Sequence, residues 1–338
     1  MPRSSSRASL CRRSFLASAA ASVLAAPALR AHQGGLRFTH AYGETVLPAP
    51  ARRVVSLGYT GQDMLLALGL APIAVRYWYG DHPFGVWPWA QPYLGDARPV
   101  LITGEVSLER VADLAPDLIL AAGSGISRAE YEVLSRIAPV LMHDPRHSPY
   151  GTPWDVETRI VGRAIGRENL AEERIAGVHA AFAAARARHP DWAGRTAVAA
   201  YQDGGQTGAF AGEDTRARFL AALGFRPPEA LGRLPLISGF YAQLSPEDLS
   251  PIDADLLIWI SSLARAPDIA GLAMRRTLRA FAQGRELFVD ELIAGALSFG
   301  SVLSLPFALK ALEADIATAL DGRPWTPVAP SVAAGIAP

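Results

Sequence analysis

The sequence predicts an α/β protein of two lobes with mainly parallel sheets, joined by a single long helix and with a ligand cleft between the lobes. Three observations lead to this prediction. Strand-like and helix-like stretches alternate along most of the chain. A long stretch dominated by Ala, Glu, Arg and Val interrupts the alternation near the middle, and a segment of the first half is echoed in the second.

The first lobe is predicted over 36–165. Short buried strands are expected at 53–57, 72–75, 117–121 and 140–142, with helices at 62–68, 107–114 and 127–137. Gly69 suits the C-cap of the first of these helices, and Ser107 suits the N-cap of the second. A loop rich in Pro, Trp and Gly runs from 76 to 104.

The connection between the lobes is predicted to be helical. Pro153, at a first helical position, begins a helix that reaches Ile165. After Gly166, the run 170–189 has no strand chemistry and ends before Pro190, so a single helix of about 30 Å is expected within a linker spanning 166–190.

The second lobe is predicted over 191–322, and a tail follows over 323–338. Its strands are expected at 196–200, 255–259 and 286–289, with a closing helix at 306–320. In open α/β sheets, ligands bind beyond the carboxyl ends of the strands, so the loops that follow these strands are the places to look for a site.

An internal repeat supports two similar halves. The segment VSLERVADLAPDLIL at 106–120 aligns without gaps with LSPEDLSPIDADLLI at 244–258. This register pairs three polar residues: Ser107 with Ser245, Glu109 with Glu247, and Asp117 with Asp255.

The first 31 residues predict an export signal rather than part of the fold. A basic, acid-free start is followed by an apolar stretch over 15–29 and by small residues that allow cleavage after Ala28 or Ala31. Arg12 and Arg13 within SLCRRSFL resemble the twin-arginine motif; an ordinary signal in an arginine-rich protein is the alternative. The expected destination is the periplasm.

Composition excludes several classes of function. Cys11 is the only cysteine and is lost with the signal, so no disulfide, thiolate metal ligand or cysteine nucleophile is expected in the mature chain. Cleavage after Ala31 removes five of the 32 basic residues and no acid, leaving a mildly acidic chain that does not suit nucleic acid. No G-x-S-x-G elbow, Walker A loop or HExxH motif is present.

Four stretches together resemble the periplasmic binding proteins for ferric siderophores and cobalamin. They are RVVSLGYTGQDMLLALGL, SLERVADLAPDLILAAG, GTPWDVETRIVGRAIGRE and ELIAGALSFGSVLSLPFAL, and they span 53–320 in the expected order. The loop DHPFGVWPWAQ is closest to the catecholate-siderophore branch. The resemblance implies two α/β lobes joined by a rigid helix, and a monomer without catalytic activity or an intrinsic cofactor.

The same resemblance implies a cargo and partners. The cargo would be ferric iron carried as a siderophore chelate, delivered to an ABC permease and its ATPase at the inner membrane. Cobalamin or haem is the alternative cargo, and an α/β hydrolase that uses the same cleft is the alternative of another class. In the family, one acidic residue on each lobe reaches toward the permease, and Glu109 and Glu247 match that role; a preference of both for a helix N-terminal turn explains them as well.

Candidate ligand contacts follow from the loops at the carboxyl ends of the strands. Aromatic faces can stack on a chelate, although packing of a long loop on its own lobe explains them equally well; the candidates are Tyr59, Trp78, Trp87, Trp89, Tyr150 and Tyr201. An anionic chelate suits planar arginine donors, and the candidates are Arg76, Arg146 and Arg265. The bias of the chain toward arginine, with Lys310 the only lysine, lowers the weight of each.

Direct coordination of a bare metal ion is not expected. His143 and His147 are four residues apart, but Pro145 between them prevents the helical face that would bring both imidazoles together.

Overall fold

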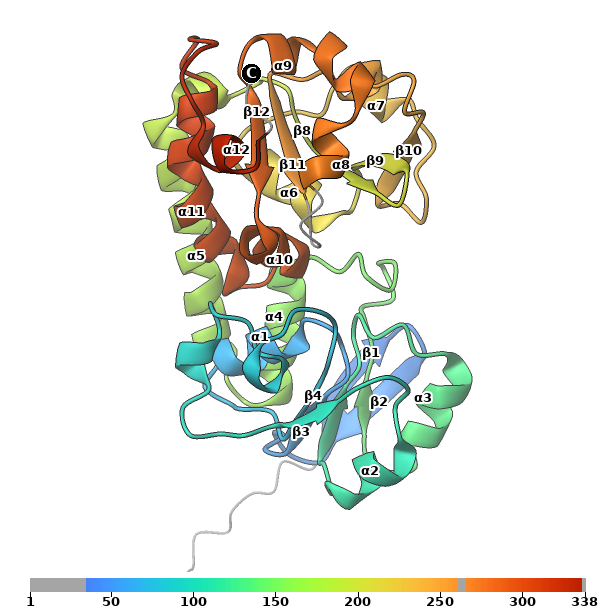
Figure 1. Cartoon of the computed structure of the whole chain (residues 1–338). Coiled ribbons are helices and arrows are strands. Elements are labelled where there is room, and N and C mark those ends of the chain that lie inside the picture. The colour runs from blue at the N-terminus through green and yellow to red at the C-terminus, as the bar shows by residue number, and fades with distance from the viewer. Residues whose placement is uncertain (1–34, 261–265, 336–338) are drawn as a thin grey trace, which may run out of the picture. The chain divides into compact units, whose positions relative to one another are not determined.

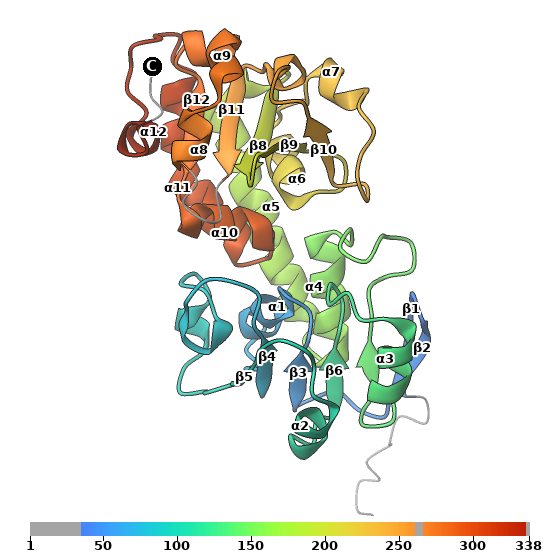
Figure 2. The same ribbon diagram turned by 45° about the vertical axis from the view of Figure 1, so that its right-hand side comes forward.

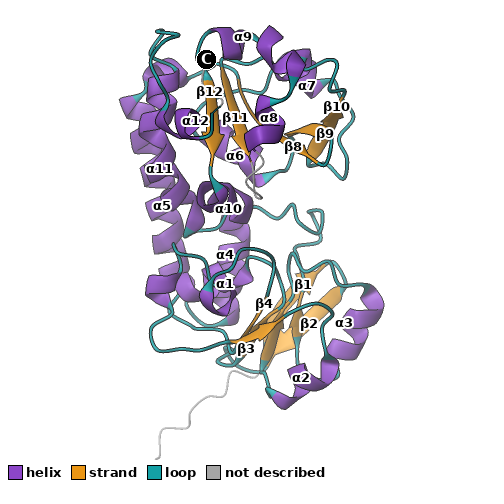
Figure 3. Cartoon of the chain, viewed as in Figure 1, coloured by secondary structure: helices purple, strands orange, loops and turns teal. Residues whose placement is uncertain are grey.

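The computed structural model describes residues 35–260 and 266–335. Contacts divide the chain into Met1–Gly35 and Leu36–Pro338. The second unit, taken by itself, contains two five-stranded sheets (Figures 1 and 3). The predicted signal and Arg265 lie outside the described residues.

The first sheet is entirely parallel and has the strand order β5-β4-β3-β6-β7. Its strands are β3 (Val54–Ser56), β4 (Ala74–Arg76), β5 (Val100–Ile102), β6 (Leu118–Leu120) and β7 (Val140–Leu141). An antiparallel hairpin precedes them, β1 (Leu36–His40) with β2 (Gly43–Leu47). The hairpin and β5, which lies inside the loop expected at 76–104, are the strands of this lobe that the sequence did not reveal.

The helices of the first lobe match their predicted places. They are α1 (Gly61–Ala67), α2 (Leu108–Asp113) and α3 (Arg128–Leu134), with 3₁₀ turns η1 (Pro83–Gly85) and η2 (Gln91–Tyr93). Ser107 caps α2 by accepting a hydrogen bond from Arg110 N–H, and Ser127 and Glu130 form a capping box at α3.

Helix α4 (Trp154–Ala164) ends the first lobe, and the long helix α5 (Glu168–Arg188) follows within the linker expected at 166–190. The 21 residues of α5 make it about 30 Å long, as expected. Its buried side chains, among them Ile175, Val178 and Phe182, pack against both lobes' helical layers, and α5 contacts α4 and α11 (Figures 1 and 2). The connection between the lobes is therefore a helix that packs against neighbouring helices, not an unpacked linker.

The second sheet is mixed and has the order β10-β9-β8-β11-β12. Its strands are β8 (Ala197–Asp203), β9 (Gln206–Phe210), β10 (Tyr241–Leu244), β11 (Leu256–Ile260) and β12 (Glu286–Val289). Strands β8, β11 and β12 are parallel to one another, whereas β9 is antiparallel to both of its neighbours, β8 and β10. The sequence revealed the parallel strands, and the antiparallel pair was missed.

Helices and short turns surround this sheet. In chain order they are η3 (Pro190–Trp192), α6 (Thr215–Ala222), α7 (Glu229–Gly232), η4 (Ser250–Ile252), α8 (Ala266–Ala270), η5 (Ala273–Thr277), α9 (Arg279–Ala282), α10 (Glu291–Phe299), α11 (Ser304–Ala319) and α12 (Ala329–Ala333). Helix α11 occupies the place predicted for the closing helix and contacts α5, α10 and β12.

The repeat found in the sequence has a structural basis. Asp117, just before β6, accepts hydrogen bonds from the N–H groups of Arg52 and Arg53 at 2.7 and 2.8 Å, just before β3. Asp255, just before β11, accepts one from the N–H of Thr196 at 2.9 Å, just before β8. In each lobe the aspartate thus ties together the starts of the two central parallel strands.

Two tryptophans of the first lobe pack against helices of the second. Trp87 and Trp89 are 1% and 6% exposed and stack with ring centroids 5.0 Å apart. A Cβ atom at Gly295 of α10 would lie 2.4 Å from the Trp87 ring, and Trp89 contacts Phe299 and Phe307 at centroid distances of 5.2 and 5.7 Å. Both tryptophans are therefore buried in the core that joins the lobes and are not among the residues that line the cavity described below.

A buried carboxyl reinforces this junction. Asp63 of α1 accepts hydrogen bonds from the Trp89 indole N–H at 2.7 Å and from the Ser301 hydroxyl at 2.5 Å, and Ser301 belongs to the turn between α10 and α11. Burial raises the pKa of Asp63 to about 6, although both hydrogen bonds act to lower it. We refer to Asp63, Trp89 and Ser301 as the lobe tie.

Candidate functional site

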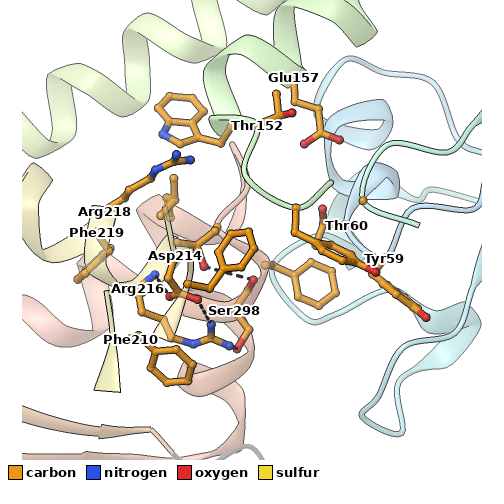
Figure 4. Close-up of a pocket in the computed structure, with 18 of the residues that line it drawn as sticks. Tyr59, Thr60, Thr152, Glu157, Phe210, Asp214, Arg216, Arg218, Phe219 and Ser298 are labelled. Carbon is orange, nitrogen blue, oxygen red and sulfur yellow. Dashed lines mark hydrogen bonds and ion pairs between the residues drawn. The ribbon is translucent and has the colours of Figure 1, made fainter. Parts of the chain in front are cut away.

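A cavity with a volume of about 560 Å³ lies between the two lobes (Figure 4). The first lobe contributes loop residues that follow β3, β4 and β6. The segment 149–157, helix α5, and the second lobe from Phe210 to Leu305 complete the wall. The cavity therefore opens at the carboxyl ends of the parallel strands of the first sheet, as expected for an α/β protein.

The first-lobe wall is aromatic. Tyr59 and Trp78 have ring centroids 5.5 Å apart, and Trp78 lies 5.4 Å from Phe299 of the second lobe. The guanidinium of Arg76 lies over the Tyr59 ring at 4.8 Å and donates a hydrogen bond to the carbonyl of Ser124 at 2.9 Å. This wall thus offers flat faces backed by one fixed positive charge.

The second-lobe wall carries a charged network. Arg216 of α6 donates to Asp214 at 2.9 Å and to the Ser298 hydroxyl at 2.6 Å, and its guanidinium lies 4.0 Å from the centre of the Phe210 ring (Figure 4). Asp214 also caps α6, and burial raises its pKa. The Nε of Arg216 is buried and has no hydrogen-bond partner in the described structure.

Two further arginines line the cavity from helices. Arg218 of α6 donates to the carbonyl of Gly151 at 3.0 Å, and Arg186 of α5 donates to the carbonyl of Ala222 at 2.5 Å. Both hydrogen bonds fix long side chains at the cavity wall without neutralising their charge. The sequence pointed to none of these arginines of α5 and α6, because an arginine on an arginine-rich helix normally faces solvent.

The segment that enters α4 adds an acid and a hydroxyl. Glu157 lines the cavity from the first turn of α4, surrounded by protein yet still accessible from the cavity, and this removal from bulk water raises its pKa to about 7. The Thr152 hydroxyl is buried without a hydrogen-bond partner in the described structure. Trp154 and His179, whose rings are 5.1 Å apart, line the same cavity.

The structure brings together three of the predicted contact residues, Tyr59, Trp78 and Tyr150, as parts of the cavity wall. Arg76 lies directly behind Tyr59. Tyr201 packs behind Phe210 at a centroid distance of 5.2 Å and does not line the cavity.

Arg146 is also outside the cavity wall. Its side chain is 74% exposed and pairs with Asp144 at 2.7 Å, which lowers the pKa of Asp144 to about 2. The ion pair with Asp144 thus holds the guanidinium of Arg146 at the surface, and a ligand contact at Arg146 stays a prediction.

Within 35–260 and 266–335, no group of three or more histidine, cysteine or acidic side chains could hold a metal ion. In the same part of the chain, no helix combines the length and the apolar character needed to cross a bilayer. The cavity can therefore offer aromatic faces, arginine donors and one unpaired acid to a ligand.

This architecture matches that of a known protein family. The model of the periplasmic binding protein family matches residues 54–286. The chain belongs to this family. The match includes the first sheet, strands β8 to β11 of the second sheet, helices α4 and α5 and most of the cavity wall.

Individual family members show the likeness in more detail. The chain is 27% identical over 231 residues to the probable siderophore-binding lipoprotein YfiY of Bacillus subtilis, a match that covers 66% of this chain and 67% of that one. The crystal structure of a periplasmic solute binding protein from Mycobacterium smegmatis has a TM-score of 0.75 and 31% identity, over 85% of this chain and 99% of that one.

A ligand-bound structure has the same fold. PiaA of Streptococcus pneumoniae in complex with ferrichrome has a TM-score of 0.72 and 23% identity, over 85% of this chain and 99% of that one. The predicted architecture of two α/β lobes joined by one long helix is therefore confirmed.

Proposed function

We propose that the protein is the periplasmic solute-binding component of an ABC importer, and that it binds a ferric siderophore in the cavity between its lobes. The membrane permease and its ATPase would receive the chelate from it. The relatives support this cargo, since YfiY is named as siderophore-binding and PiaA is solved with ferrichrome. We also propose export through the 1–31 signal, and the division into lobes 36–165 and 191–322.

The observation that carries the proposal is the composition of the cavity wall. A volume of about 560 Å³ suits a bulky ligand. The rings of Tyr59, Trp78 and Phe299 line the same cavity as the guanidinium groups of the arginines. Aromatic faces with fixed guanidinium groups suit an anionic metal chelate with a planar or apolar backbone.

The packed junction between the lobes fits the same role. The tryptophan packing and the lobe tie hold the cavity in one arrangement before the ligand enters. A preformed cavity loses little conformational entropy on binding, which favours a rigid ligand that cannot adapt. Iron would then arrive and leave inside its chelator, and the protein would need no metal ligands of its own.

Docking to the permease is proposed at Glu109 and Glu247. Both side chains are exposed, and they stand at matching places of the repeat, eight residues before the equivalent Asp117 and Asp255. Glu109 lies in the first turn of α2, whereas Glu247 lies in the turn closed by Ser245 and Asp248. Only the first of them has the helix-terminal position that would explain its charge without docking.

Titration of the tryptophan fluorescence tests the cargo. Trp78 and Trp154 line the cavity, so a ferric siderophore should quench the emission of the purified mature protein at micromolar concentration or below. Free tryptophan corrects for light absorbed by the chelate, and the iron-free siderophore is the matched control. Quenching by cobalamin or haem but by no ferric chelate would overturn the iron assignment, and turnover of a small substrate would overturn the whole class.

A further inference from the structure

Glu157 stands out among the acids of α4 because nothing neutralises it. Its neighbour Asp155 pairs with Arg159 at 2.8 Å, and Arg159 also pairs with Glu172 at 2.7 Å on the exposed side of the helices. No hydrogen bond or ion pair is found for the Glu157 carboxyl within the described structure, although it lines the cavity. A carboxylate that is removed from bulk water without a hydrogen bond or ion pair costs free energy, so the Glu157 carboxyl lacks a stabilising partner in the ligand-free protein.

Thr152 gives a second, independent sign of a missing partner. Its hydroxyl is buried without a hydrogen bond, whereas the hydroxyl of nearby Thr158 donates to the carbonyl of Trp154 at 2.6 Å. Glu157 and Thr152 both line the cavity from the segment that enters α4, and Figure 4 draws them on the same side of it. At this end of the cavity, the carboxyl of Glu157 and the hydroxyl of Thr152 therefore both lack a hydrogen-bond partner within the described structure.

The cations of the cavity are occupied elsewhere. Arg218 of α6 donates to a backbone carbonyl, Arg186 of α5 does the same, and Arg216 pairs with Asp214. His179 is the remaining ionisable side chain of α5 in the wall, and it packs against the Trp154 ring. On α1, Asp63 is held by the lobe tie. None of these groups supplies the charge that Glu157 lacks.

We propose that Glu157 and Thr152, together with the face of Trp154, form a subsite for an ammonium group carried by the chelate. An ammonium has several N–H donors, so it can satisfy a carboxylate and a hydroxyl at once, and a tryptophan face attracts a cation. The cavity would then take a ligand with two unlike ends, the oxygen-rich iron chelate toward the network of Arg216 and a free amine toward α4. This inference rests on the proposed function and narrows its cargo to amine-bearing ferric chelates.

The test compares two probes that differ in one group. Ferrioxamine B ends in a free ammonium, and its N-acetyl derivative ends in a neutral amide while the iron site is unchanged. The wild-type protein should bind the ammonium form at least about tenfold more tightly, as expected for a hydrogen-bonded charge in a buried site. Calorimetry in buffers of different ionisation enthalpy should also show proton release at neutral pH, because the cation converts Glu157 to its carboxylate.

Variants assign the effect to these side chains. Glu157→Gln should abolish the preference for the ammonium form, so that this variant binds the two probes with equal affinity. Thr152→Val should lower the preference about threefold. Glu168→Gln is the matched control, since Glu168 is an exposed acid in the first turn of the neighbouring helix α5; it should keep the full preference.

The outcomes separate the two proposals. Equal binding of both probes by the wild type, or an unchanged preference in Glu157→Gln, would overturn the ammonium subsite. Rejection of both probes, with tight binding of a ferric chelate that has no amine, would overturn the subsite and leave the proposed function standing. Failure to bind any ferric chelate would overturn the proposed function itself.

Discussion

The two lobes share a skeleton but build unlike walls for the cavity. Each lobe ties the starts of its central strands through an equivalent aspartate, Asp117 or Asp255. Around this shared frame, the first lobe presents rings such as Tyr59 and Trp78, whereas the second adds the network of Arg216 and Asp214 to its own rings. The duplicated sheet thus fixes where a site can be, and the loops and helix ends on each side decide its chemistry.

The largest expected effect concerns the outer surfaces, where we propose that the lobes are alike. The double variant Glu109→Arg and Glu247→Arg should abolish iron uptake in cells and leave chelate affinity unchanged, because charge reversal on each lobe repels a basic permease surface. Growth on the ferric chelate and fluorescence titration measure the two properties. Glu132→Arg with Glu229→Arg, also exposed acids on each lobe, is the control. Persistent uptake in the double variant would refute the docking role.

The second prediction addresses the lobe tie. The pKa of Asp63 is about 6 in the folded protein, above its ordinary 3.8. Folding therefore favours the protonated form, whose stabilising effect is complete below 3.8 and is lost as pH rises through 6. Relative to Asp63→Asn, the wild type should lose about 3 kcal/mol of unfolding free energy over this range, at about 1.36 kcal/mol per pKa unit.

Denaturant unfolding of both proteins across this range of pH measures the difference. Other titrating groups act equally in both proteins, so the difference isolates Asp63. Ser301→Ala should enlarge the total loss of stability and extend it to higher pH, because loss of its hydrogen bond raises the pKa of Asp63 further. Parallel stability profiles for the wild type and Asp63→Asn would contradict the assignment.

The charged wall of the second lobe gives the next effect. Arg216→Met should weaken binding of an anionic ferric chelate about thirtyfold, about 2 kcal/mol, because a fixed guanidinium is lost and Asp214 is left unpaired. Fluorescence titration measures it. Arg233→Met removes an arginine that is exposed and pairs only with the exposed Glu229, and it should change nothing. If the wild type, Arg216→Met and Arg233→Met bound the chelate with equal affinity, the proposed role of the charged wall would be wrong.

The aromatic wall of the first lobe gives the smallest effect. Trp78→Leu should weaken binding about fivefold, about 1 kcal/mol, because one stacking face is lost while an apolar surface remains. Trp325→Leu is the matched control, since Trp325 is 80% exposed and lies outside the cavity wall. A loss larger than that of Arg216→Met would reverse the ranking of the two walls.

Much of the fold was predictable because it is encoded locally. Short apolar runs became the parallel strands, and capping residues such as Ser107 marked the helix starts. The hairpin β1–β2 and the pair β9–β10 were missed, since their strands alternate with polar residues and pair only with neighbours along the chain. Local patterns describe an element better than they describe its partners.

The site was less predictable because burial depends on distant contacts. Trp78 and Trp87 look alike in one aromatic loop, yet one lines the cavity and the other is covered by α10. Arg146 and Arg216 both bond to an aspartate two residues earlier, but the surroundings place the first in solvent and the second in the cavity wall. No sequence pattern separates these cases without the packing.

The close approach of Gly295 to Trp87 bears on how such proteins diversify. With 2.4 Å between the ring and the position of a Cβ, α10 tolerates no side chain there while the indole is in place. If the first lobe alone were exchanged for that of a relative, a different 76–104 loop would pack against α10, and the close contact between Trp87 and Gly295 would be lost. A chimaera designed to transfer ligand preference must therefore exchange 76–104 and α10 together, although these two segments belong to different lobes.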